Sequence, residues 1–133
     1  MIPSEYTCDG IDISPPLSIS DVPKEAKSLA IIMDDLDAPM GTFTHWVVWN
    51  ITPQKSQFVK GEKTSFPEGR TGFGSKSYGG PCPPGGTHRY FFKLYALDLV
   101  LNLKEGSSKT DLEKAMAEHI LAEATMMGKY SRR

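Results

Sequence analysis

Short runs of apolar, β-branched and aromatic residues recur along the chain and predict a mainly β protein. They cover Ser28–Met33, His45–Ile51, the weaker Gln57–Lys60, and Tyr90–Leu101, which carries the strongest signal. No helical segment separates these runs, so we expect the strands to pair in an antiparallel fashion. Residues 1–23 are irregular and rich in turn-forming residues.

One segment near the C-terminus has the periodicity of a helix. Its side chains recur at helical spacing at Leu112, Ala115, Met116, His119 and Ile120. Thr110 followed by Glu113 fits a capping box at the start, and Gly128 offers a stop at the end. The pattern predicts a terminal helix of about four or five turns, with His119 as a structural residue on its apolar face.

The length of 133 residues predicts a single domain spanning residues 1–133. The 15 Lys and Arg residues against 16 Asp and Glu residues give a net charge of −1, which leaves no positive surplus for nucleic acid or a polybasic membrane anchor. No apolar run approaches the ~18 residues that span a bilayer, so no integral membrane association is expected. No signal peptide is visible at the N-terminus, so we expect a cytoplasmic protein.

The two cysteines, Cys8 and Cys82, allow at most one disulfide and form no Cys-x-x-Cys motif. Two free thiols are the ordinary expectation for a cytosolic protein. Asn and Gln are scarce, however, and depletion of these thermolabile residues is a weak sign of a thermophile, whose intracellular proteins do use disulfides. A Cys8–Cys82 bridge therefore stays open, because spacing alone does not decide it.

Carboxylates gather directly after the first predicted strand. Asp35 and Asp37 point to the same side of an extended chain, because the side-chain period of a strand is two. His45 opens the next strand across a turn, and a carboxylate such as Asp37 would fix its tautomer and leave the other ring nitrogen for a ligand. The residues alone leave a solvated acidic turn as the alternative. The Ala38–Pro39 bond can be trans or cis.

Half of the chain's 12 glycines and 10 prolines lie between Pro67 and Gly86. This composition predicts a stiff loop with accessible backbone amides, which suits one wall of an anion site. The loop leads into the strongest strand, on which His88, Tyr90 and Phe92 share one face. A histidine and a tyrosine beside a rigid loop favour a binding site over a core.

Several motifs, in order along nearly the whole chain, resemble the phosphatidylethanolamine-binding protein (PEBP) family, and most closely its short bacterial and archaeal branch. The segment Asp35-Leu36-Asp37-Ala38-Pro39 is similar to the family's Asp-Pro-Asp-Ala-Pro signature. Gly80-Pro81 and His88-Arg89-Tyr90 are similar to its second signature. The similarity extends to Tyr6–Gly10, to Ser14–Leu17, to the segment 45–48 and to the expected terminal helix.

The resemblance implies a Greek-key antiparallel β-sandwich with one C-terminal α-helix. It also implies a small pocket for a phosphate-like group such as a phosphoethanolamine or phosphotyrosine head. Carried over by position, the residues implied to line this pocket are Asp35, Asp37, His45, Gly80, Pro81, His88 and Tyr90. A cis bond between Ala38 and Pro39 is implied as well, and backbone amides near Gly80 are expected to add hydrogen-bond donors to the anion.

The chain departs from the family pattern in three respects. Leu36 replaces the central proline of the first signature, which loosens that turn. Relatives carry roughly a strand's worth of residues before the position of Met1, which leaves two alternatives: the edge strand is missing, or the sequence is truncated at this end. The C-terminal segment of the longer eukaryotic members has no counterpart, so their kinase regulation is not expected.

We therefore expect a non-enzymatic, cytoplasmic binding protein for a small anionic ligand, with a regulatory role through a protein or small-ligand partner. It should need no cofactor and no metal. One alternative is a serine-protease inhibitor that uses the exposed loop 67–86; another is a hydrolase or metal enzyme built from Asp35, Asp37, His45, Cys82 and His88. Dimers occur among prokaryotic relatives, so a homodimer stays open. Protonated imidazoles should favour binding at about pH 5.5–6 over pH 8.

Overall fold

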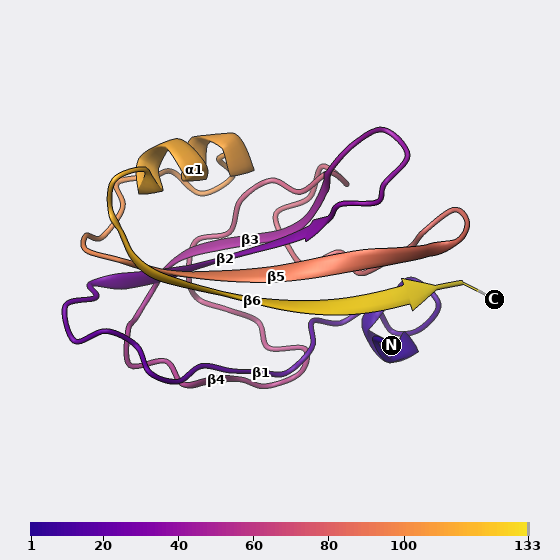
Figure 1. Ribbon diagram of the computed structural model, residues 1–133, viewed down its shortest axis with the longest axis horizontal. Helices are drawn as coiled ribbons and strands as arrows, with labels where there is room; N and C mark the ends of the chain where they lie inside the picture. Colours follow the sequence, from indigo (N-terminus) through magenta and orange to yellow (C-terminus); the bar gives the residue numbers. More distant parts are fainter. Residues whose placement is uncertain (133) are drawn as a thin grey trace.

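A four-stranded antiparallel sheet forms the centre of the molecule (Figure 1). The computed structural model describes residues 1–132. The sheet has the strand order β3-β2-β5-β6, and a two-stranded sheet pairs β1 with β4. In chain order the elements are η1 (Ser4–Tyr6), β1 (Leu17–Ser18), β2 (Ser28–Asp35), β3 (Phe43–Ile51), β4 (Gln57–Phe58), β5 (Thr87–Leu97), α1 (Lys109–Met116) and β6 (Ile120–Ser131).

The large sheet is covered on both faces. Leu29, Ile31 and Met33 of β2 pack toward the small β1–β4 sheet. Ala30 and Ile32 point the other way, toward α1, which lies across the opposite face in Figure 1. Every residue of β2 is therefore buried, which explains why its sequence is a continuous apolar run instead of an alternating one.

The predicted fold class is confirmed: the protein is mainly β, with antiparallel sheets and one helix. The four predicted strands correspond to β2, β3, β4 and β5. The segment 67–86 contains no helix or strand. An isolated bridge between Val48 and Glu68 and several backbone hydrogen bonds, such as that from the Gly69 N–H to the Val47 carbonyl at 2.9 Å, join it to β3. The predicted loop is therefore present as such.

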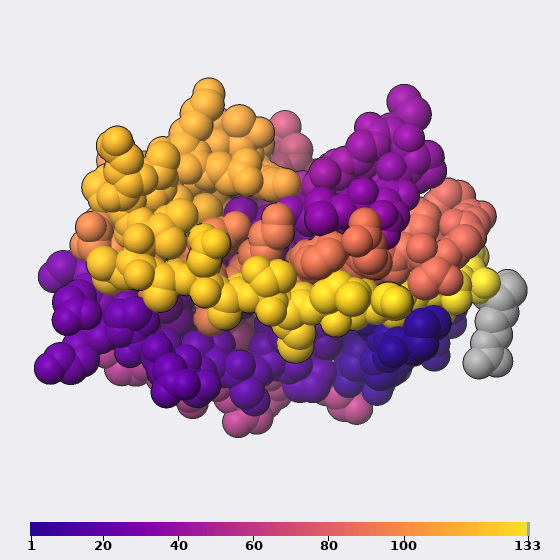
Figure 2. Space-filling model, in the orientation of Figure 1, coloured from indigo at the N-terminus to yellow at the C-terminus, as the bar shows by residue number. Residues whose placement is uncertain are grey.

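The predicted C-terminal helix is wrong for most of its length. The helix α1 ends at Met116, and the next strand, β6, pairs with β5 from Ile120 opposite Leu97 to Ser131 opposite Thr87. In Figure 2 it runs as a continuous strip along the visible face. Most of its side chains are exposed, so strict alternation of polar and apolar residues is not required of it. Pairing along the whole of β5 overrides the helical propensity of its Ala, Leu, Met and Glu residues.

The start of the helix also differs from the prediction. Ser108, not Thr110, is the N-cap, and its hydroxyl accepts a hydrogen bond from the backbone N–H of Asp111. The Asp111 carboxylate accepts in return from the Ser108 N–H, which completes the capping box two residues early. His119 lies after the helix and is partly exposed, with Nδ1 2.9 Å from an Asp98 carboxylate oxygen.

The expected cis bond between Ala38 and Pro39 is also wrong, because residues 1–132 contain no cis peptide bond. The trans isomer is intrinsically favoured for such bonds by about 0.5–1 kcal/mol. The turn closes without the cis isomer, since the Gly41 N–H donates to the Ala38 carbonyl at 3.1 Å. Gly41 has a φ of 104°, which glycine adopts without steric cost.

A disulfide joins Cys8 to Cys82 and resolves the question that spacing left open. It ties the N-terminal turn to the loop 67–86. Two hydrogen bonds support the same contact: the Cys8 N–H donates to the Pro81 carbonyl at 3.1 Å, and the Tyr78 hydroxyl donates to the Tyr6 carbonyl at 2.7 Å. Within residues 1–132, no helix is long and apolar enough to cross a membrane.

Removing the disulfide should lower stability because the bridge closes a chain segment with a sequence separation of 74 residues. For the Cys8→Ser/Cys82→Ser variant we expect a loss of about 2–4 kcal/mol in the free energy of unfolding, measured by urea denaturation. Wild-type protein reduced with dithiothreitol should match the variant. A variant within about 0.5 kcal/mol of the oxidised wild type would contradict the expectation.

Candidate functional site

A cavity of about 210 Å³ lies where the end of β2, the start of β3 and the start of β5 meet the loop 67–86. We call it the histidine–tyrosine cavity. Its lining consists of Asp35, Ala38, Pro39, Phe43, His45, Phe73, Cys82, Pro83, Pro84, His88 and Tyr90. Four of the predicted site residues therefore meet here, although they lie far apart in sequence.

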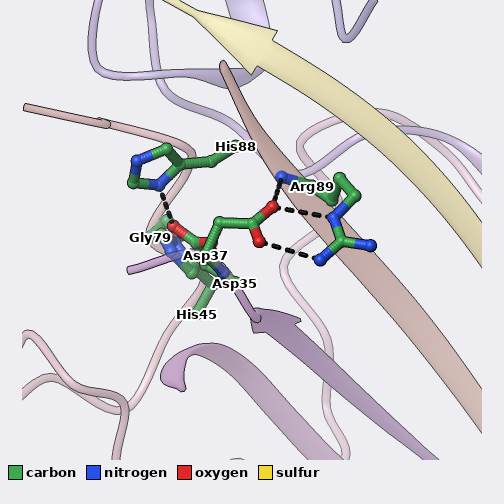
Figure 3. Close-up of polar contacts among 6 residues, drawn as sticks. All are labelled: Asp35, Asp37, His45, Gly79, His88 and Arg89. Carbon is green, nitrogen blue, oxygen red and sulfur yellow. Dashed lines mark hydrogen bonds and ion pairs between the residues drawn. The ribbon is translucent and has the colours of Figure 1, made fainter. Parts of the chain in front are cut away.

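A buried carboxylate–imidazole pair forms one side of the cavity (Figure 3). Asp35 Oδ2 lies 2.6 Å from His88 Nδ1, and the two residues are 4% and 6% exposed. The other oxygen, Oδ1, accepts the backbone N–H of Asp37 at 2.8 Å. Because Nδ1 is engaged, Nε2 is the nitrogen of His88 that remains for a ligand.

His45 is held by a backbone carbonyl instead of a carboxylate. Its Nδ1 lies 2.6 Å from the Gly79 oxygen, so Nδ1 carries the hydrogen and donates it. The rings of Phe43, Phe73 and Tyr90 surround the imidazole at centroid distances of 5.1–5.3 Å. Burial in this shell lowers the pKa of His45 below its ordinary value of 6.5. In the neutral ring Nε2 is a hydrogen-bond acceptor.

An irregularity in the pairing of β2 with β3 aims His45 into the cavity. Met33 is opposite Trp46 and Asp34 is opposite Thr44, so His45 is an extra residue between the two pairs. Without this bulge His45 would share a face with Val47, which packs on the α1 side. The sequence carries no evident signal for the bulge.

Tyr90 supplies an unpaired polar atom. The side chain is fully buried, and its hydroxyl makes no hydrogen bond of good geometry, although the Asp35 carboxylate and the Cys82 backbone lie near enough to act on its pKa. Burial raises the pKa of Tyr90, so the hydroxyl stays protonated. Leaving a buried hydroxyl unpaired costs about 1–3 kcal/mol, which a bound acceptor would recover.

Asp37 does not line the cavity. It accepts three hydrogen bonds from Arg89, from the backbone N–H at 2.9 Å and from Nε and Nη2 at 2.8 Å each. These contacts hold the pKa of Asp37 well below its usual range. The expectation that Asp37 orients His45 is therefore wrong, because Arg89 engages this carboxylate and Gly79 holds the imidazole (Figure 3).

Gly80 and Pro81 are not among the residues that line the cavity. The Gly80 N–H already donates to Asp12 Oδ1 at 2.8 Å, so it is not free for an anion. A side chain at Gly80 would collide with the Tyr6 carbonyl and the Asp12 carboxylate, which explains the glycine. Both residues position the next three residues, 82–84, which do line the cavity.

Sequence reasoning missed the apolar part of the lining. Phe43 could have been found, because it lies two residues before His45 and shares its face. Pro83 and Pro84 stood in the loop already singled out, but nothing in their pattern marked them as lining residues. For Phe73, which contacts both Phe43 and His45, the sequence gives no signal.

The charges of the cavity are unbalanced. The lining contains the Asp35 carboxylate but no lysine or arginine. Within the described part of the chain, no group of three or more His, Cys, Asp or Glu residues could hold a metal ion. What the cavity offers is a set of hydrogen-bonding atoms, namely two imidazole Nε2 atoms and one phenolic hydroxyl.

The fold and the site together define a class of protein: antiparallel β proteins with a small cavity lined by histidines and a tyrosine. The family model described as phosphatidylethanolamine-binding protein matches residues 1–131. The chain belongs to the phosphatidylethanolamine-binding protein family, and the resemblance seen in its motifs is confirmed.

Relatives in archaea and bacteria support this assignment. The UPF0098 protein of Methanothermobacter thermautotrophicus is 53% identical over 137 residues, covering 98% of this chain and 91% of the relative. The UPF0098 protein of Aquifex aeolicus is 48% identical over 139 residues, covering 98% and 81%.

Solved structures agree closely with the fold. The PEBP homologue CT736 from Chlamydia trachomatis D/UW-3/CX has a TM-score of 0.97 at 45% identity, covering 99% of this chain and 90% of the homologue. YbcL of E. coli, described as a member of the mammalian PEBP family, has a TM-score of 0.91 at 28% identity, covering 100% and 92%.

The lowered pKa of His45 predicts a dependence of stability on pH. Between the ordinary value of 6.5 and the lower folded value, the unfolded chain binds the proton more readily, so stability falls as the pH drops below 6.5. We expect wild-type protein to lose stability between pH 7 and pH 5 in urea denaturation, and His45→Gln to lose less. His119→Gln, at a partly exposed site outside the cavity, is the matched control and should behave like wild type. If His45→Gln lost as much stability as His119→Gln between pH 7 and pH 5, the expectation would be contradicted.

Proposed function

We propose that this protein binds a small oxyanion, such as a phosphate group or a phosphoethanolamine head group, in the histidine–tyrosine cavity. The observation that carries the proposal is the buried Tyr90 hydroxyl without a partner, beside two imidazoles whose Nδ1 atoms are already engaged. The three residues come from β3 and β5 and line one cavity. A ligand with several oxygen atoms would satisfy them together.

The size of the cavity supports a small ligand. Its volume of about 210 Å³ is below the ~300–1,000 Å³ of pockets for drug-sized molecules. Proline residues and the disulfide hold the loop wall in place, so the site is formed before a ligand arrives. The family description names phosphatidylethanolamine, a phosphodiester whose head group contains phosphoethanolamine.

We propose a binding role and not a catalytic one. Cys82 lines the cavity, but its sulfur is bonded to Cys8 and is therefore not a thiolate nucleophile. Neither serine nor threonine is among the lining residues, so the Asp35–His88 pair has no hydroxyl of that kind to activate.

Titration calorimetry with sodium phosphate and with phosphoethanolamine tests the proposal. We expect His88→Ala to weaken binding about 10- to 100-fold, because a hydrogen bond to a charged ligand is lost. His119→Gln is the control and should bind like wild type. A crystal soaked in phosphate should show density at Nε2 of both His45 and His88.

Two results would count against the proposal. One is an empty cavity in crystals soaked at high phosphate concentration, together with no heat of binding in solution. The other is inhibition of a chymotrypsin- or trypsin-like protease that survives His88→Ala while no oxyanion binds, which would place the activity on the loop 67–86.

A further inference from the structure

We propose that the histidine–tyrosine cavity selects a phosphate or phosphate monoester as the monoanion that still carries a P–OH group. Phosphodiesters and the phosphate dianion should bind more weakly. This inference rests on the proposed oxyanion site and adds to it the protonation state and the esterification of the ligand.

The charges around the cavity oppose a dianion. The lining holds one carboxylate, that of the buried Asp35, which contacts His88, and it contains no lysine or arginine. Nearby cations are engaged elsewhere. Arg89 is bound to Asp37, while Lys109 and Lys93 lie 2.9 and 3.7 Å from Asp34 on the α1 side of β2. A second negative charge on the ligand would enter without a counterion.

The hydrogen-bonding roles call for a donor on the ligand. The Gly79 carbonyl can only accept, so the hydrogen of His45 is fixed on Nδ1 and Nε2 of the neutral ring accepts. An oxyanion can donate to Nε2 only through a hydroxyl, which a phosphate monoester monoanion has and a phosphodiester lacks. The Tyr90 hydroxyl then serves as the donor to an unprotonated oxygen of the same ligand.

The groups that face His45 favour the neutral ring, in which Nδ1 donates and Nε2 accepts. Asp34 and Asp35 of β2 and Asp12 of the N-terminal segment are the carboxylates that act on it, and His88 and Tyr90 face it from β5. The aromatic shell opposes their attraction for a proton, because desolvation is the larger effect on the imidazole. The neutral ring, whose Nε2 accepts, is therefore favoured more strongly here than in a solvated histidine.

The rim of the cavity suits an ester substituent. Pro39, Phe73 and Pro84 line the cavity and are exposed to solvent, so they mark its opening. All three are apolar. A monoester would place its phosphate among His45, His88 and Tyr90 and its carbon substituent against this rim.

Ethyl phosphate and dimethyl phosphate form a matched pair of probes, because they are isomers and both are monoanions at pH 5. Only ethyl phosphate has a P–OH group. In titration calorimetry at pH 5 we expect ethyl phosphate to bind about tenfold more tightly or better. At pH 8 it is mostly a dianion, since the second pKa of a phosphate ester is about 6, and its affinity should fall by about tenfold or more. Dimethyl phosphate corrects for titration of the protein over the same range.

His45→Gln tests the role assigned to the imidazole. A glutamine amide offers both a donor and an acceptor, so the preference for ethyl phosphate should shrink toward equality. His119→Gln should keep the wild-type preference. Circular dichroism confirms that both variants are folded.

The outcomes separate this inference from the proposed function. Dimethyl phosphate binding as tightly as ethyl phosphate, or ethyl phosphate binding more tightly at pH 8, overturns the selectivity and leaves the oxyanion site standing. A full preference retained in His45→Gln overturns the role of His45. Absence of binding by ethyl phosphate, dimethyl phosphate and inorganic phosphate overturns both proposals.

Discussion

The complete burial of β2 is the constraint on which the rest of the structure depends. This strand ends in two consecutive carboxylates, Asp34 and Asp35, which are 0% and 4% exposed. A buried carboxylate without partners is strongly unfavourable, and successive side chains of a strand point to opposite faces. The protein must therefore supply partners on both sides of the same sheet.

The two sides meet this demand differently. On the α1 face, Asp34 accepts hydrogen bonds from Lys109 at 2.9 Å and Thr44 at 3.3 Å, which anchors the helix to the sheet. On the cavity face, Asp35 receives His88 and the Asp37 N–H. One pair is thus structural. The other fixes an imidazole with its second nitrogen available, so the stabilising contact of Asp35 also shapes the candidate site.

Much of the fold could be predicted from the sequence, because local pattern and tertiary structure agree in its interior. The apolar runs that became β2, β3 and β5 are buried against both layers. The C-terminal segment could not be predicted in this way. Residues 120–131 have helix-forming side chains and few buried positions, so only their pairing with β5 determines that they form a strand.

The candidate site was likewise predicted only in part. The family motifs predicted that one site contains Asp35, His45, His88 and Tyr90, and these four residues do line one cavity. They did not show that Arg89 turns Asp37 outward or that the Gly80 amide is used by Asp12. They also did not show the bulge that turns His45 inward. Each of these depends on contacts between segments far apart in sequence, and the trans Ala38–Pro39 bond likewise depends on how the whole turn closes.

The Cys8–Cys82 bridge has a consequence for access to the cavity. Cys82 is at once part of the cavity lining and one end of the covalent link to the N-terminal turn. While the bridge is intact, residue 82 of this wall cannot separate from the N-terminal turn. The exposed lining residues Pro39, Phe73 and Pro84 mark the opening of the cavity, and among these three only the Phe73 side chain is free to rotate, because each proline ring is fixed to its own backbone.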